Sequence, residues 1–205
     1  MSGTTDLRIV KTQAAIRSRF LDLLLQKNFN EITVKDITQA ANIGRGTFYL
    51  HYKDKFDLLD KVMREGLDAT VGHFQPQHYF QNGIIVPERG IRFLSSIYTF
   101  FRKNERFFRA MLFNEGVPNF KGRLQQCFLA KFRREIGGIL PTDSHADAIT
   151  MEILPIFISS GMIGLIEWWF RTGRHISEQD MARRIYQVVT RGPLQTLGIR
   201  IDDRT

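Results

Sequence analysis

The chain has 205 residues, of which 43% are hydrophobic and 24% are charged, and its formal net charge is +8 at pH 7. These fractions lie near the averages for folded globular proteins and exclude a disordered or fibrous chain. The single cysteine, Cys127, excludes a scaffold held by intrachain disulfides, and the N-terminus lacks the apolar core of a secretory signal peptide, so the sequence favours the cytoplasm.

The chain starts with an amphipathic helix followed by a short one. Residues 6–27 place apolar side chains on one face at helical spacing. Thr33, with Asp36 three residues later, has the spacing of a capping box and predicts the start of a second helix. Asn42 tolerates the left-handed backbone of a tight turn, so we expect the chain to turn at residues 42–44.

A third short helix, from Arg45 to about Leu50, completes a helix-turn-helix pattern, and a longer helix follows at about 54–72. The DNA major groove admits one α-helix, which a partner helix must hold from behind. The expected inward side chains are Ile37, Ala41, Ile43 and Phe48. The side chains left for the groove or its rim are Arg45, Thr47, Tyr49 and His51.

The glycines and lysines around this helix allow two interpretations each. Gly46 would let DNA approach the helix closely, although Gly44 and Gly46 could equally do no more than permit the turn. Lys53 and Lys55, with the amides at the start of the next helix, could hold a backbone phosphate or could simply be solvated.

Helical patterns continue to the end of the chain, which predicts an all-α fold. Residues 72–90 hold two prolines and three glycines without a clear period, and they are the candidate junction between domains. The further helices are expected near 87–103, 105–114, 121–137, 145–171 and 178–191.

The helix predicted at 145–171 is apolar nearly all round, so both of its sides must be covered. Its uncharged run, 153–166, is shorter than the roughly 20 residues of a membrane span, and we expect cover by a second copy of the chain. A monomer that hides this surface internally is the alternative. The expected interface residues are Phe157, Gly161, Gly164, Leu165, Trp168, Ile185, Val188 and Val189.

Aromatic residues are concentrated in the second half and could line an apolar cavity for a small molecule, or could be plain core. The candidate cavity residues are Phe100, Phe101, Phe108, Phe113, Phe128 and Trp168. Cys127 is expected to be a buried small hydrophobe, with a redox sensor as the alternative. The sequence contains no metal-ligand spacing, phosphate-binding glycine loop or nucleophile elbow, so neither an enzyme nor a cofactor or metal site is predicted.

The stretch Ile32 to Leu59, ITVKDITQAANIGRGTFYLHYKDKFDLL, resembles the DNA-binding signature of the TetR/AcrR transcriptional regulators. The resemblance implies a homodimeric repressor with an N-terminal three-helix head on DNA and a C-terminal helical domain that binds a small ligand and dimerises. We accordingly divide the chain at residues 1–53 and 54–205, with the helix at about 54–72 as the link.

The same resemblance implies roles for individual residues. Thr33 and Lys35 would touch the DNA backbone, and Arg45, Gly46 and Thr47 would face bases. The phosphate contacts would be Tyr49, His51 and Lys55, beside the Lys53 noted above. Two-fold symmetry predicts a palindromic operator. The alternative function is an all-α dimer that acts through a protein partner.

Overall fold

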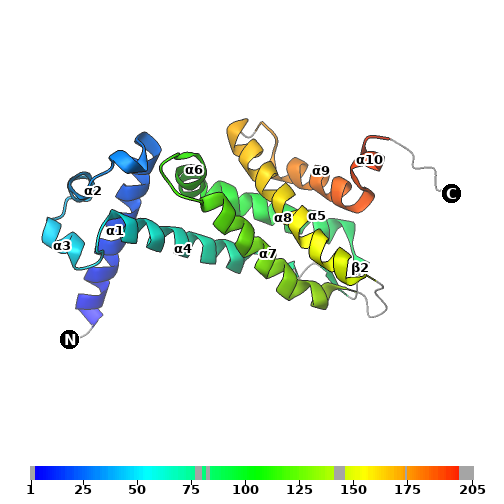
Figure 1. Cartoon of the computed structure of the whole chain (residues 1–205), viewed down its shortest axis with the longest axis horizontal. Helices are drawn as coiled ribbons and strands as arrows, with labels where there is room; N and C mark the ends of the chain where they lie inside the picture. The colour runs from blue at the N-terminus through cyan, green and yellow to red at the C-terminus, as the bar shows by residue number, and fades with distance from the viewer. Residues whose placement is uncertain (1–2, 77–79, 82–83, 141–145, 174, 199–205) are drawn as a thin grey trace. The chain divides into compact units, whose positions relative to one another are not determined.

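The computed structural model describes residues 3–76, 80–81, 84–140, 146–173 and 175–198 and confirms the all-α fold (Figure 1). The first helices are α1 (Gly3–Gln26), the 3-10 turn η1 (Phe29–Glu31), α2 (Val34–Ala40), α3 (Arg45–Tyr49) and α4 (Lys55–His73). The later ones are α5 (Pro87–Lys103), α6 (Glu105–Phe113), α7 (Phe120–Ile139), α8 (Ala148–Arg171), α9 (Glu178–Arg191) and α10 (Pro193–Thr196). The start expected at His145 lies outside the described residues.

The junction between α4 and α5 contains a minimal β-ribbon that the sequence did not predict. Strand β1 (Phe80–Gln81) pairs antiparallel with β2 (Ile84–Ile85), and Phe80 lies opposite Ile85. Pairs of two residues are too short to produce the alternating pattern by which a strand is found in a sequence.

The helices form two compact units, and the first is discontinuous in the chain. It combines Met1–Ala69 with Asn104–Leu124, whereas the second combines Thr70–Lys103 with Gln125–Thr205. Helix α6 therefore belongs to the same unit as the predicted helix-turn-helix, although the division predicted at residue 53 assigned it to the other domain. The division into a DNA-binding domain at 1–53 and an effector-binding and dimerisation domain at 54–205 remains a prediction.

The core of the first unit is built from the apolar faces of its helices. Ile16 and Phe20 of α1 and Phe48 of α3 are completely buried. Phe29 joins the core from η1, with its ring edge-on to Phe20 at 6.2 Å between centroids. Ile9, near the start of α1, lies outside this core and is 42% exposed.

The second unit is organised around α5, which packs along α9. Tyr98 of α5 lies edge-on to Trp169 of α8, with 5.2 Å between ring centroids, and both are buried. Ser177 caps α9 by accepting a hydrogen bond from the backbone N–H of Asp180, as the sequence predicts. Arg102 and Glu178 form an ion pair between α5 and α9 at 2.5 Å.

Helix α8 has 24 residues and, among the described helices, is the one long and apolar enough to cross a membrane by length and composition. The helix is longer than the uncharged run at 153–166 because it extends past both flanking glutamates, Glu152 and Glu167. One side of α8 is nevertheless built into the protein, where Ile166, Trp169 and Phe170 are buried. The remaining apolar side of α8 is exposed in one copy, with Ile153 and Phe157 59% and 64% exposed.

Candidate nucleic-acid interface

A complete capping box fixes the start of α2. The Thr33 hydroxyl accepts from the backbone N–H of Asp36 at 3.2 Å, and the Asp36 carboxylate accepts from the Thr33 backbone N–H at 2.8 Å. The ammonium of Lys27 donates to the same carboxylate at 2.9 Å. This hydrogen bond, with those from Thr33, lowers the pKa of Asp36 to about 2. The Thr33 hydroxyl also donates to Asp36, so it is already engaged in the cap.

Asn42 forms the turn between α2 and α3. Its φ of 52° lies in the left-handed region that asparagine tolerates, as expected from the sequence. The backbone N–H of Ile43 donates to the carbonyl of Thr38 at 3.0 Å and closes the turn. Gly44 has a φ of −73° and an ordinary extended backbone, so the turn itself does not need this glycine.

Helix α3 buries one side and exposes the other. Phe48 is completely buried, whereas Arg45 and Gly46 are exposed and Tyr49 is 57% exposed. A Cβ built on Gly46 would have no atom within 4 Å, so nothing in the described structure requires glycine there. This open space favours the interpretation in which Gly46 admits a close partner. Thr47 is half-buried at the edge of the same face.

Four of the predicted contact side chains have free polar groups. No hydrogen bond or ion pair within the described part of the chain engages the side chains of Lys35, Arg45, Tyr49 or Lys53. Lys35, Arg45 and Lys53 are exposed cations, and exposed Lys and Arg are the groups that hold backbone phosphates.

Lys55 differs from its neighbours, because its side chain is engaged within the protein. Its ammonium donates to three carbonyl oxygens, those of Phe29 (3.1 Å), Asn30 (2.9 Å) and Ile32 (2.8 Å). It also lies over the Phe29 ring, 4.8 Å from the centroid. An ammonium has three N–H donors, so none is left for a phosphate. These contacts favour Lys55 as a clamp on η1, and its predicted phosphate contact remains a prediction.

His51 lies between the first and fourth helices. Its Nδ1 is 3.4 Å from the side-chain nitrogen of Gln13, and its carbonyl accepts from the ammonium of Lys61 at 3.1 Å. Lys61 also pairs with Asp57 at 3.0 Å. The Nε2 atom of His51 remains available for a phosphate, and the backbone that presents it is held from both sides.

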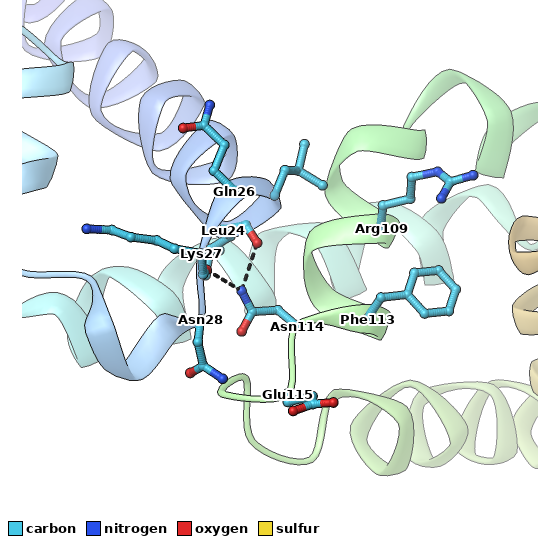
Figure 2. A pocket seen from close by; sticks show the side chains of 9 residues that line it. Leu24, Gln26, Lys27, Asn28, Arg109, Phe113, Asn114 and Glu115 are labelled. Atoms are coloured by element: carbon cyan, nitrogen blue, oxygen red, sulfur yellow. Dashed lines mark hydrogen bonds between the residues drawn. The ribbon is translucent and has the colours of Figure 1, made fainter.

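Asn114, which the sequence analysis did not single out, holds the end of α1 from the loop after α6 (Figure 2). Its amide nitrogen donates to the carbonyls of Leu24 (2.7 Å) and Lys27 (3.0 Å). Its amide oxygen accepts from the backbone N–H groups of Phe29 and Gly116, both at 3.0 Å. A cavity of about 440 Å³ adjoins this junction. A contact across 85 to 90 positions leaves no local signal in a sequence.

Gly116 fits closely against the same turn. A Cβ at this position would collide with the Asn28 side chain and would lie 2.9 Å from the Phe29 backbone nitrogen. On the other side of α6, Arg106 pairs with Asp22 of α1 at 2.6 Å. The loop between α1 and α2 is therefore fixed by Lys55 from α4 and by the α6 region.

Two cations of α1 were also missed as candidate contacts. Arg8 and Lys11 are exposed and line a shallow cavity of about 480 Å³ with Ile43, the residue after the left-handed turn. Because Ile43 belongs to the helix-turn-helix, these cations extend its basic surface.

The predicted effector residues are not gathered at one cavity. Phe101, Phe108 and Phe128 are core residues, at most 3% exposed. Phe113, Phe100 and Trp168 line three different cavities. Phe108 and Phe113 lie in the first unit and the other four in the second. The role of these residues in binding an effector remains a prediction. Cys127 is half-buried on α7, and its alternative role as a redox sensor remains a prediction as well.

The predicted interface residues lie mainly along one apolar groove of about 450 Å³ between α8 and α9. From the prediction it includes Phe157, Gly161, Leu165, Trp168, Ile185, Val188 and Val189. Phe157 and Val189 are 64% and 62% exposed, whereas Ile185 is buried at its base. Gly164 lies outside the groove lining and faces open space. Exposed apolar patches of this kind mark interaction surfaces.

Two family models match the chain. Residues 21–62 match the family described as bacterial regulatory proteins, tetR family, and residues 91–191 match the one described as transcriptional regulator C-terminal region. The first match contains the whole helix-turn-helix, and the second runs from α5 to the end of α9. Both describe regulators rather than enzymes.

Curated relatives match part of the chain. The HTH-type transcriptional regulator YxbF of Bacillus subtilis is 39% identical over 69 residues, which are 33% of this chain and 18% of YxbF. The dhaKLM operon activator DhaS of Lactococcus lactis is 27% identical over 92 residues, 45% of this chain and 48% of DhaS. The chain thus spans less than half of the length of these curated relatives.

Among solved structures, a TetR transcriptional regulator from Streptococcus agalactiae superposes with a TM-score of 0.62 at 23% identity, covering 92% of this chain and 99% of that one. At this identity the superposition supports the fold alone.

Proposed function

The chain belongs to the tetR family of bacterial regulatory proteins and is a DNA-binding transcriptional regulator, and from this premise we propose that it is a cytoplasmic, homodimeric repressor released from a palindromic operator by a small molecule. The observation that carries the DNA-binding surface is the exposed side of α3 and its surroundings. There Arg45 and Tyr49 have free polar groups, and Gly46 has open space above it.

The proposed contacts divide by role. Arg45, Gly46 and Thr47 face bases, since they are the first residues of the helix that would enter the major groove. Lys35, Tyr49, His51 and Lys53 hold phosphates, and the backbone of Thr33 approaches the DNA at the start of α2. Arg8 and Lys11 of α1 add further phosphate contacts.

The groove between α8 and α9 supports the proposed dimer. A second copy laid on Phe157, Leu165 and Val189 would cover side chains that are more than a third exposed in one copy. Two-fold symmetry would place two recognition helices on two half-sites about one helical turn of DNA apart or somewhat more.

Release by a ligand requires only that the ligand bind better to the arrangement that does not fit DNA. Movement of α6 would reach the end of α1 through Asn114, and movement of α7 would reach α4 through the Arg123–Asp60 pair, at 2.9 Å. The name of DhaS states activation, but we propose repression for this chain. Repression needs no contact surface for the transcription machinery, because the bound dimer itself occupies the promoter.

The first experiment is a selection of random duplex DNA on the purified protein, with light scattering on the same preparation. An enriched palindrome bound by a dimer supports the proposal, and transcription from a promoter carrying it then separates repression from activation. Failure to enrich any sequence over a range of salt concentrations contradicts it and favours the dimer that acts through a protein partner.

A further inference from the structure

The outward face of α5 carries a stripe of polar and cationic side chains. Arg92, Ser95, Ser96, Thr99 and Lys103 recur at steps of three and four residues, so they lie on one side of the helix. With His73 and Phe100 they line a cavity of about 580 Å³, which lies in the size range of small-molecule sites. All seven residues belong to the second unit.

The charge of this cavity has one sign. Arg92 and Lys103 are exposed cations, and the lining contains no carboxylate. Glu88, one turn before Arg92, lies outside the lining and makes no ion pair with it. Three cations that follow in the sequence are paired, Arg102 with Glu178, Arg106 with Asp22 and Arg109 with Glu105. Within the described residues Arg92 and Lys103 have no such partner.

Hydrogen-bond donors lie between these two charges. Ser96 donates its hydroxyl to the carbonyl of Phe93 at 2.8 Å, but Ser95 and Thr99 make no side-chain hydrogen bond with any described residue. Both are half-buried and line the cavity, so their hydroxyls are donors that no described residue uses.

His73 and Phe100 form an aromatic wall. Their rings stack at 4.7 Å between centroids with 17° between planes. The His73 Nε2 atom lies 3.1 Å from the carbonyl oxygen of Ser96, and because a carbonyl only accepts, Nε2 carries a proton. The imidazole is thereby held in one orientation.

We propose that this cavity is a binding site for a small organic anion. Its carboxylate or phosphate ester is held by Arg92 or Lys103, which lie toward the two ends of the cavity, with hydroxyl donors from Ser95 and Thr99, and its apolar body lies against Phe100 and His73. The site is separate from the α8–α9 groove and from the DNA-binding surface. The proposal does not depend on whether binding alters the affinity for DNA.

We would test this proposed anion site by calorimetric titration of the full chain. The ligands are octyl phosphate, octanoate and neutral 1-octanol, at matched ionic strength. We expect the anions to bind and the double variant R92Q/K103Q to weaken that binding at least about tenfold, since each exposed ion pair contributes a few-fold. The matched control is Arg133→Gln, which removes an exposed cation of α7 outside the cavity and should leave binding unchanged.

The two anions distinguish the headgroup. Tighter binding of octyl phosphate would indicate a phosphate ester as the ligand class, and equal or tighter binding of octanoate a carboxylate. Equal binding of 1-octanol, equal weakening in Arg133→Gln, or absence of binding would overturn the proposal. Ser95→Ala with Thr99→Val, which leaves the charges in place, should weaken binding by a smaller factor if the hydroxyls donate to the anion.

Discussion

Replacing Lys55 by methionine tests whether this lysine is a clamp on η1 or a phosphate contact. Methionine keeps most of the unbranched side chain that lies against Phe29 but removes the ammonium. Three carbonyl oxygens lose their charged donor, and two of them, from Phe29 and Ile32, are half-buried.

The expected loss of stability follows from these contacts. A hydrogen bond to a charged group contributes about 1.5–3 kcal/mol when it is well protected. We discount this to about 1 kcal/mol for each half-buried carbonyl and to nearly nothing for the exposed carbonyl of Asn30. Lys55→Met should therefore lower the free energy of unfolding by about 2 kcal/mol.

The assay combines urea unfolding with the salt dependence of DNA binding, measured by fluorescence anisotropy on an arbitrary duplex at fixed protein concentration. A lost phosphate contact lowers the slope of log Kobs against log salt by about 0.9. We expect Lys55→Met to keep the slope, whereas the control Lys53→Met, on an exposed side chain without a described partner, should keep the stability and lower the slope. Unchanged stability with a lower slope for Lys55→Met would refute the clamp.

Three further outcomes are expected. The lowered pKa of Asp36 means that its carboxylate stabilises the fold above about pH 4 and loses that effect as pH falls through about 2. Because its side chain is 30% exposed, Asp36→Asn should cost about 1 kcal/mol at pH 7 and only a small part of that near pH 2, as read from urea midpoints. Asn114→Ala removes four hydrogen bonds at the end of α1 and should lower the free energy of unfolding by about 2–3 kcal/mol, measured in the same way. Val189→Glu places a charge in the α8–α9 groove and should give a folded monomer by light scattering.

Each outcome has a result that would contradict it. A cost for Asp36→Asn that stays constant down to pH 2 would show that charge is not the cause. Asn114→Ala with wild-type stability would mean that solvent replaces the four bonds. Gln187→Glu, an exposed change on α9 outside the groove lining, is the control for Val189→Glu; if both variants remain dimeric, the groove is not the interface.

Structural features could be predicted from the sequence when the residues that interact lie close together in the chain. The Thr33–Asp36 capping box and the left-handed Asn42 were found from the sequence because both are fixed within a few residues. Tyr49 and Phe48 were sorted correctly by helical period into exposed and buried. By contrast, the capture of the Lys55 ammonium by η1 crosses 23 to 26 residues, and a lysine in a sequence looks the same whether it is free or engaged.

The aromatic residues show a second limit. The large number of aromatic residues in the second half of the chain predicted an apolar interior. The number alone does not show which of these residues are packed in the core and which line a cavity. Phe101 is completely buried, whereas Phe100, its neighbour on α5, faces outward and stacks on His73. The apolar face of α8 was easier to assign, since a helix without a polar side needs cover at every angle.

The discontinuous first unit has a consequence for the order of events during synthesis. Helices α1 to α4 leave the ribosome long before residues 104–124, so the end of α1 waits for Asn114 while the chain in between is made. The head reaches its full stability only after α6 has emerged and closed this long loop. A DNA-binding fragment cut after residue 53 would lack that contact permanently, and a chimera that exchanges heads between regulators needs to exchange α6 with them.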